Sequence, residues 1–168
     1  MSPERTYPYG AFNYLVNLKS EGVDPQSVLG GFSDVSGIGT EMTLSEYRTG
    51  VDAINHVRKV PGVHKVSDVT LKRGIVNSSD LWTWISQVRR EGPAAKREVI
   101  ITLRDEGGSD VQSWKLKGVV PMKYTGPTLA AKGGGDVAME ELVLSAEELL
   151  FVGSDNKELD KAPTSAHV

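Results

Sequence analysis

The sequence predicts a β-rich (α+β) domain with one α-helix and a long, polar hairpin arm. Three observations support this fold class. Eighteen glycines and eight prolines in 168 residues imply many turns, which favours strands over a helical bundle. Several short segments alternate apolar and polar residues, which is the period of a half-buried strand. Helical spacing of apolar residues is clearest in one segment, residues 81–88.

The composition excludes several classes of protein. The chain is long enough for one domain, and its 39% hydrophobic and 24% charged residues are ordinary for a globular protein. Cysteine is absent, which excludes disulfides and thiolate metal sites. The net charge of −3 argues against a general nucleic-acid binder. The first residues have no apolar signal segment, and no apolar run approaches membrane-spanning length. We therefore expect synthesis and folding in the cytoplasm, without membrane insertion.

The N-terminal part is predicted as a loose arm followed by two strands. Residues 1–9 contain Pro3 and Pro8, which interrupt regular structure, so we expect a flexible N-terminal arm before one domain over residues 10–152. The second strand is expected at about residues 28–35. The first strand is predicted from alternating apolar residues: Phe12, Tyr14, Val16 and Leu18.

Residues 40–60 are predicted to form a hairpin arm that leaves the domain. Met42, Leu44 and Glu46 alternate with small or polar neighbours, and residues 49–52 can turn the chain back. Too few large apolar residues follow to anchor a second core strand. Long connections in compact domains are usually functional, so an arm explains this segment better than a disordered loop.

Residues 61–92 are predicted as the frame of the domain, a strand followed by the helix. Val69, Leu71 and Ile75 share one parity of the strand. Arg73 shares that parity too, so we expect it at a sheet edge or at a contact.

The helix is expected to pack Leu81, Trp84, Ile85 and Val88 on one face, because they are spaced i, i+3, i+4 and i+7. Residues 77–80 supply capping side chains at its start. Arg89 and Arg90, followed by Gly92 and Pro93, mark its end.

The C-terminal part is predicted to be strands. A hairpin joins residues 98–104 to residues 113–124, with Gly118 and Pro121 marking a bend. Residues 125–135 read as a loop, and residues 137–151 as mostly strand rather than a short helix starting at the capping-box pattern of residues 145–148. Residues 153–168 are expected to be a disordered tail. One face of the return strand is expected to carry Trp114, Leu116, Val120, Met122 and Tyr124.

Catalytic signatures are missing, so we expect no enzyme, no cofactor and no metal. The three histidines, His56, His64 and His167, have no carboxylate at ligand spacing. Residues 133–135 are three glycines without the Lys-Ser/Thr of a phosphate-binding loop. The basic pairs at residues 72–73 and 89–90 have acids nearby, which favours solvated or paired side chains over phosphate contacts.

Two features favour an assembly protein over an enzyme. An arm without core anchors is easiest to explain if it packs on another subunit, and unpaired strand edges can be closed in a ring. Trp82 points away from the apolar face of the helix, so either a second layer of the domain or a partner must cover it.

Four short motifs, in this order and spacing, carry a resemblance. They are EYRTG at residues 46–50, VPG at 60–62, VTLKRG at 69–74 and LWTW at 81–84, followed by an acidic strand at 140–142. Over about residues 10–151 the chain resembles the T4-like tail tube family, the tail-tube proteins of contractile phages and the inner-tube proteins of extracellular contractile injection systems.

The resemblance implies a small β-barrel or sandwich of two packed sheets flanked by a helix. Six copies would form a ring, and rings would stack into a tube. The tube would lie inside a sheath, with baseplate or spike and tube-terminating proteins at its ends, and would carry effector protein or DNA in a released particle or a virion. The residues that we expect at subunit interfaces are Glu46, Tyr47, Arg48, Gly50, Arg58, Pro61, Lys72, Arg73 and Trp82.

Two departures from the family and three alternatives remain at this stage. The tail after Phe151 is longer than the domain needs, and the resemblance does not explain it. The family often has an acidic residue where this chain has Thr49, so an ion pair expected there is in doubt. The alternatives are a secreted ring protein of the type VI kind, a monomeric β-barrel that binds a small ligand, and a hydrolase, for which no nucleophile and base can be nominated.

Overall fold

The computed structural model describes residues 6–19, 31–51, 53–54, 56–76 and 79–153. These residues form strands, one α-helix and a short 3₁₀-helix, η1. In chain order they are β1 Tyr14–Lys19, β2 Asp34–Ser36, β3 Thr40–Tyr47, β4 Arg58–Val66, β5 Val69–Gly74, α1 Asp80–Glu91, η1 Gly92–Ala95, β6 Arg97–Arg104, β7 Asp110–Thr125, β8 Met139–Ser145 and β9 Glu148–Val152.

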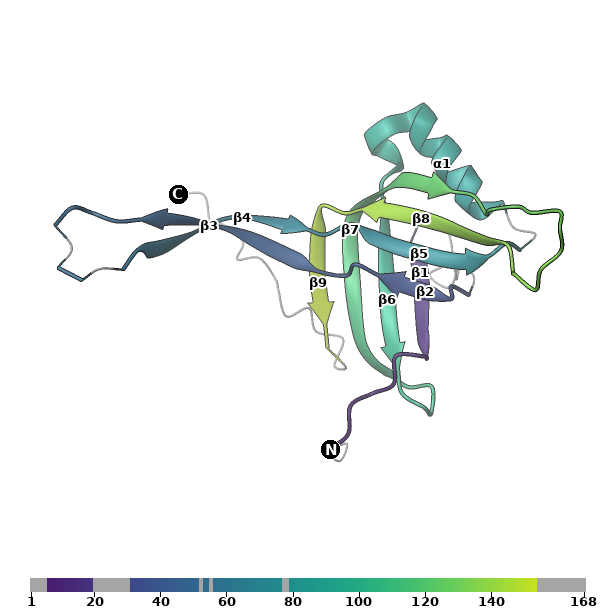
Figure 1. Cartoon of the computed structure of the whole chain (residues 1–168), viewed down its shortest axis with the longest axis horizontal. Helices are drawn as coiled ribbons and strands as arrows, with labels where there is room; N and C mark the ends of the chain where they lie inside the picture. The colour runs from purple at the N-terminus through teal and green to yellow at the C-terminus, as the bar shows by residue number, and fades with distance from the viewer. Residues whose placement is uncertain (1–5, 20–30, 52, 55, 77–78, 154–168) are drawn as a thin grey trace.

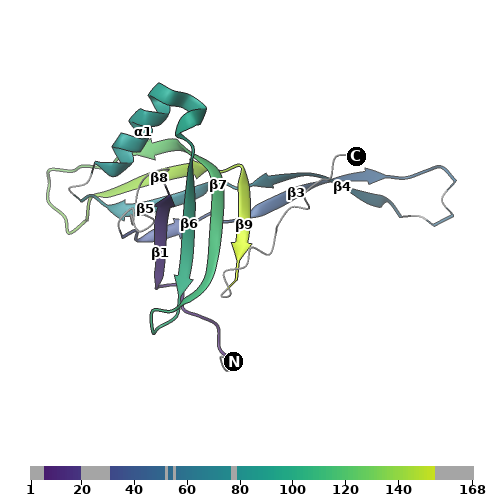
Figure 2. The same cartoon turned by 180° about the vertical axis from the view of Figure 1, so that it is seen from behind.

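Two layers of antiparallel strands share the long strand β7. The strand order is β1-β6-β7-β8-β5-β2, and β9 pairs with β7 as well. Residues 113–117 of β7 pair with β9, whereas its last residues pair with β8. Gly118, at a φ of 63°, lies between the two halves and supplies the bend that was predicted there. In Figures 1 and 2, β1, β6 and β9 run across the direction of β5 and β8. The predicted fold of two packed sheets, a flanking helix and a hairpin arm is therefore confirmed.

The core lies between the two layers and under α1. Its largest fully buried side chains are Trp84, Leu71, Leu81, Leu116, Leu142 and Leu144. Two predicted core positions are wrong: Phe12 is 75% exposed and Ile75 is half exposed, because β1 begins at Tyr14 and β5 ends at Gly74.

The predicted alternation along β7 holds only up to the bend. Leu116 is fully buried as predicted, but after Gly118 the buried residue is Val119 rather than Val120. Met122 is exposed, although it was predicted on the core face. The alternation is interrupted twice, by the positive φ at Gly118 and by an irregularity in the pairing with β8 between Pro121 and Lys123.

Helix α1 forms as its spacing predicts, with Leu81, Trp84 and Ile85 buried. Trp84 donates from Nε1 to the carbonyl oxygen of Ala95 at 3.2 Å. Gly92, with a φ of 59°, ends the helix. Ser79 is the N-cap residue, but its side chain makes no capping hydrogen bond, so that part of the capping prediction is wrong. Residues 77 and 78 lie outside the described residues.

The arm is a two-stranded sheet of β3 and β4 that projects away from the rest of the domain (Figure 1). We use "arm" for residues 40–66, because Thr40 lies opposite Val66 in the ladder. The hairpin is therefore longer than the predicted residues 40–60, and the start of the predicted frame belongs to it. Gly37 precedes the arm with a φ of 83°, and a Cβ there would collide with the carbonyl oxygen of Asp68. Only glycine fits this root of the arm.

The segment after the β6–β7 hairpin contains two strands where one was predicted. Residues 126–138 form a loop, as expected, and β8 and β9 follow it. The chain turns between them at Ala146 and Glu147, so the short helix does not form. Leu142 and Leu144 are buried on one face of β8, which explains why strand geometry prevails. The predicted tail from residue 154 and residues 28–30 of the predicted second strand lie outside the described residues. Of the remainder of that predicted strand, only Asp34 and Val35 are in β2, which extends to Ser36.

Candidate assembly interface

The nine predicted interface residues lie on the arm, on β5, on α1 and, for one of them, in the core. Six of them lie on the arm and are exposed to solvent, and Tyr47 is 59% exposed. These six are Glu46, Tyr47, Arg48, Gly50, Arg58 and Pro61. Lys72 lies on β5 with an exposed side chain that faces Glu141 at 3.5 Å. Trp82 lies on α1. Arg73 is buried, so the prediction that it contacts another subunit is wrong.

Arg73 forms a buried ion pair instead. Its Nε lies 2.5 Å from Oε1 of Glu140, and the two side chains are only 3% and 9% exposed. The hydroxyl of Tyr124 donates to the other carboxylate oxygen of Glu140 at 2.8 Å. The guanidinium also lies 5.8 Å from the ring centroid of Phe32. β5 pairs with β2 on one side and with β8 on the other, so Arg73 is not on an edge strand of the sheet either.

We expect Glu140→Leu to lower the free energy of unfolding by about 3–5 kcal/mol, because it leaves the Arg73 charge buried without its partner. Urea denaturation monitored by tryptophan fluorescence measures the loss. The matched control is the double variant Arg73→Met/Glu140→Leu, which removes both charges and should recover most of the stability. Equal destabilisation of the single and the double variant would contradict the importance of pairing at this site.

The arm exposes many large apolar side chains to solvent. Every residue of β3 is exposed, as is every residue of β4 except Val66. An isolated two-stranded hairpin is marginally stable in water, so such a ribbon needs a surface to pack on. The exposed large apolar residues of the arm are Met42, Leu44, Tyr47, Val51, Ile54, Val57, Val60 and Val63. The sequence-based interface prediction includes only Tyr47 of these, although the alternation along β3 could have identified Met42 and Leu44.

The two edges of the arm differ. Lys59, Pro61 and Lys65 lie on β4, and lysine and proline are residues that protect exposed edges from further strand pairing. β3 has neither, and it carries two glutamates, Glu41 and Glu46. The side chains of Leu44 and Pro61 lie opposite one another, as do those of Glu46 and Lys59.

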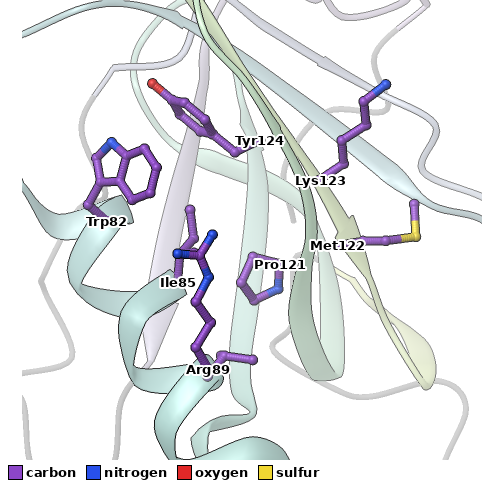
Figure 3. Close-up of a pocket in the computed structure, with 8 residues that line it drawn as sticks. Trp82, Ile85, Arg89, Pro121, Met122, Lys123 and Tyr124 are labelled. Atoms are coloured by element: carbon purple, nitrogen blue, oxygen red, sulfur yellow. The ribbon is translucent and has the colours of Figure 1, made fainter.

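A groove lies between α1 and β7 (Figure 3). Its volume is about 250 Å³, and we call it the α1–β7 groove. Trp82 is 46% exposed, and its ring centroid lies 4.9 Å from that of Tyr124. Trp82 was expected to be covered either by a second layer of the domain or by a partner. Tyr124 of β7 covers part of the Trp82 side chain, and the remainder is exposed to solvent. The groove is lined by Trp82, Ile85, Val88, Arg89, Pro121, Met122, Lys123 and Tyr124.

A chain of contacts connects the buried ion pair to this groove. Tyr124 connects Glu140 to Trp82, so Arg73, Glu140, Tyr124 and Trp82 form one chain of contacts from the core to the surface. Burial raises the pKa of Tyr124, and the hydrogen bond to Glu140 and its charge raise it further. The hydroxyl therefore stays protonated and keeps donating to Glu140 at neutral pH.

The layer that contains β1, β6, β7 and β9 ends in two edge strands, β1 and β9. β1 pairs only with β6, and β9 pairs only with β7, within the part of the chain that the structure describes. Neither strand contains proline, so both edges can accept another strand. A copy that presents β1 to the β9 of its neighbour would continue the sheet from one subunit to the next.

Metal-binding groups and membrane-spanning helices were also sought in the described residues. They contain no group of three or more histidine, cysteine or acidic residues arranged to hold a metal ion. Across the same residues, no helix has the length and apolar character needed to cross a membrane.

Comparison with known proteins identifies relatives of this architecture. The family profile of the T4-like virus tail tube protein gp19 matches residues 10–150. No curated protein matches the sequence. The chain is similar in fold to a chain of the PVC sheath–tube complex, an extracellular contractile injection system in its extended state. The two share 23% identity and a TM-score of 0.74, over 88% of this chain and 93% of that chain.

Two further structures share the fold. A chain of the 6-fold symmetrised baseplate of the anti-feeding prophage is 22% identical, with a TM-score of 0.77 over 89% of this chain and 99% of that one. The Hcp1 protein from E. coli EAEC 042 is 18% identical, with a TM-score of 0.51 over 88% of this chain and 96% of that one.

Proposed function

We propose that copies of this chain close into six-membered rings that stack into a hollow tube, because the chain belongs to the T4-like virus tail tube protein family. It is a structural subunit of a tail tube. The family is one of structural tube proteins, and we propose that this subunit acts through a rigid, sealed wall and without catalysis.

The exposed arm is the observation that supports assembly best. An amphipathic ribbon that leaves its own domain exposes apolar surface along its whole length, and burying that surface in another copy would stabilise both partners. The interface residues proposed on the arm are Glu46, Tyr47, Arg48, Gly50, Arg58 and Pro61, to which the exposed Met42 and Leu44 are added.

The open edges of β1 and β9 support closure of the ring. A contact between two different surfaces repeats from copy to copy and closes when the rotation between copies completes a circle. Pairing β1 with the β9 of the next copy is such a contact, and it would join the sheets into a continuous wall. The 6-fold symmetry of the anti-feeding prophage baseplate, which contains a similar chain, suggests six copies.

We propose a contractile particle as the setting. Similar chains occur in a sheath–tube complex, a baseplate and a tube-terminating cap, so a sheath around the tube and terminating proteins at its ends are the partners that fit. The cargo would be effector protein or DNA in the lumen. The subunit would be made in the cytoplasm and assembled into a phage-tail-like particle that is released, or into a virion.

A secreted ring protein of the type VI kind is the second candidate. The similarity to Hcp1 favours it, since that chain is covered almost completely. The lower TM-score of Hcp1, compared with those of the two contractile-particle chains, favours the tube of a contractile particle.

We expect the purified full-length chain to form rings and stacked tubes. Negative-stain microscopy should show six-fold ring averages, and light scattering should report species far above the monomer mass of 18.2 kDa. Stacked tubes would favour the contractile particle, and single rings alone would favour the type VI kind. Scattering from monomer only throughout the micromolar range, even with sheath or baseplate proteins added, would contradict assembly.

A further inference from the structure

We propose that β3 of one copy docks in the α1–β7 groove of another copy. Met42 and Leu44 of the arm pack against Trp82 and Met122, and Glu46 lies beside Arg89. This docking rests on the proposed function, because it requires that copies assemble, and it identifies the surface that receives the arm.

The groove has the chemistry of a receptor for an acidic, apolar strand. Its lining is aromatic and aliphatic, with two cations, Arg89 and Lys123, and no carboxylate. Neither cation makes an ion pair within the described residues. Figure 3 shows the Arg89 side chain extending along the groove below Trp82. A carboxylate that enters beside apolar side chains would therefore find unpaired positive charge.

One face of β3 presents the complementary set. Residues two apart in a strand lie on the same face, so Met42, Leu44 and Glu46 form a stripe of two apolar side chains and one carboxylate. The irregularity in the ladder places three steps of β4, from His64 to Pro61, opposite two steps of β3. The additional residue is in β4, so the alternation along β3 is kept. β3 contains no cation.

The spacings along the two elements match. From Met42 to Glu46 the strand advances four residues, or about 13 Å. From Trp82 to Arg89 the helix advances seven residues, or about 10 Å. A strand laid along α1 thus brings Met42 to Trp82 when Glu46 is at Arg89, and the flexible Met and Arg side chains can span the difference.

The groove is also held in place before anything binds. Trp82 packs on Tyr124, whose hydroxyl is held by the buried Glu140. A surface that is already ordered loses little conformational entropy on binding. The arm cannot reach the groove of its own chain, because it projects away from α1 (Figure 2). The occupant is therefore the arm of a second copy.

A charge exchange tests this contact. Glu46→Lys makes both sides of the contact basic, and Arg89→Glu makes both acidic, so each variant alone should form at least about tenfold fewer tubes than the wild type at equal concentration. An equimolar mixture of the two variants should assemble again, since each arm then meets a groove of opposite charge. The double variant Glu46→Lys/Arg89→Glu should assemble by itself.

Two matched controls lie next to the contact but outside it. Glu41→Lys changes the other glutamate of β3, and Arg90→Glu changes the next residue of α1; both are exposed, and both variants should form tubes like the wild type. Single variants that assemble normally, or single variants that neither the mixture nor the double variant rescues, would overturn the docking alone. Wild-type protein without rings or tubes would overturn the proposed function and the docking with it.

A disulfide cross-link tests the docking of β3 in the α1–β7 groove independently of charge. The chain has no cysteine, so the double variant Leu44→Cys/Met122→Cys introduces the only two thiols. Oxidised assemblies should give a ladder of covalent oligomers on a denaturing gel, whereas Leu44→Cys/Arg90→Cys should not. Absence of the ladder from assembled Leu44→Cys/Met122→Cys protein would overturn the docking.

Discussion

Replacing Trp84 with alanine should lower the free energy of unfolding by about 3–5 kcal/mol. The Trp84 side chain is fully buried between α1 and the sheets, and its indole donates to the carbonyl oxygen of Ala95. The guanidinium of Arg97 lies 5.4 Å from its ring centroid. The substitution thus leaves a cavity, an unpaired carbonyl group and a cation without its aromatic partner. Thermal and urea denaturation of the isolated chain measure the loss.

Trp82 provides the control within the same helix. Its ring is half exposed and contacts Tyr124 at the surface, so Trp82→Ala should cost the isolated chain much less than Trp84→Ala. It should reduce tube formation more than it reduces stability, because exposed aromatic residues are frequent anchors of interfaces. Equal losses of stability in the two variants would show that the buried and the open faces of α1 are misassigned.

Excising the arm should abolish tubes and leave the domain folded. Thr40 and Val66 lie directly opposite one another, so residues 41–65 can be replaced by an Asn-Gly turn that closes the shortened hairpin. The residues that are removed contribute no side chain to the buried core. Closing a shorter connection changes the chain entropy little. Circular dichroism should remain native-like and the melt cooperative, whereas microscopy should show no tubes.

Point variants extend this experiment. Changes at Tyr47 and Arg48 should weaken assembly in the same direction, since aromatic and arginine side chains are common at interface centres. If the excision unfolds the domain, the arm is a part of the fold and not an appendage. If the excised chain still forms normal tubes, the arm does not link the subunits, and contacts such as those of β1 and β9 must suffice.

Local patterns in the sequence predicted most of the fold. The apolar spacing of α1, the burial of Val69 and Leu71 on one face of β5 and the projection of a hairpin arm from the domain were all interpreted correctly. Each is a property of consecutive residues, because helix and strand periods alone decide which side chains share a face. The resemblance of four motifs then predicted the family, which the profile match over residues 10–150 confirms.

The incorrect predictions for individual side chains concern environments that the neighbouring residues in the sequence do not reveal. Arg73 was expected at an interface, but Glu140, 67 residues later, holds it in the core. The exposed Met122 lies between the bend at Gly118 and an irregularity in the pairing with β8 between Pro121 and Lys123, and the alternation of residues reveals neither. The half-covered state of Trp82 depends on Tyr124, which only the packing of β7 beside α1 brings near.

The sequence by itself determined most of the elements, the buried face of the helix and the family of this chain, since these depend on local period and on motifs in order. Only the tertiary structure decided which charged residue is buried, where the arm is rooted and that a cationic groove lies open between α1 and β7. Those features arise from contacts between segments that the sheet order brings together. Such a contact does not produce a periodic pattern of residues in either segment, so it cannot be predicted from the sequence of one segment alone.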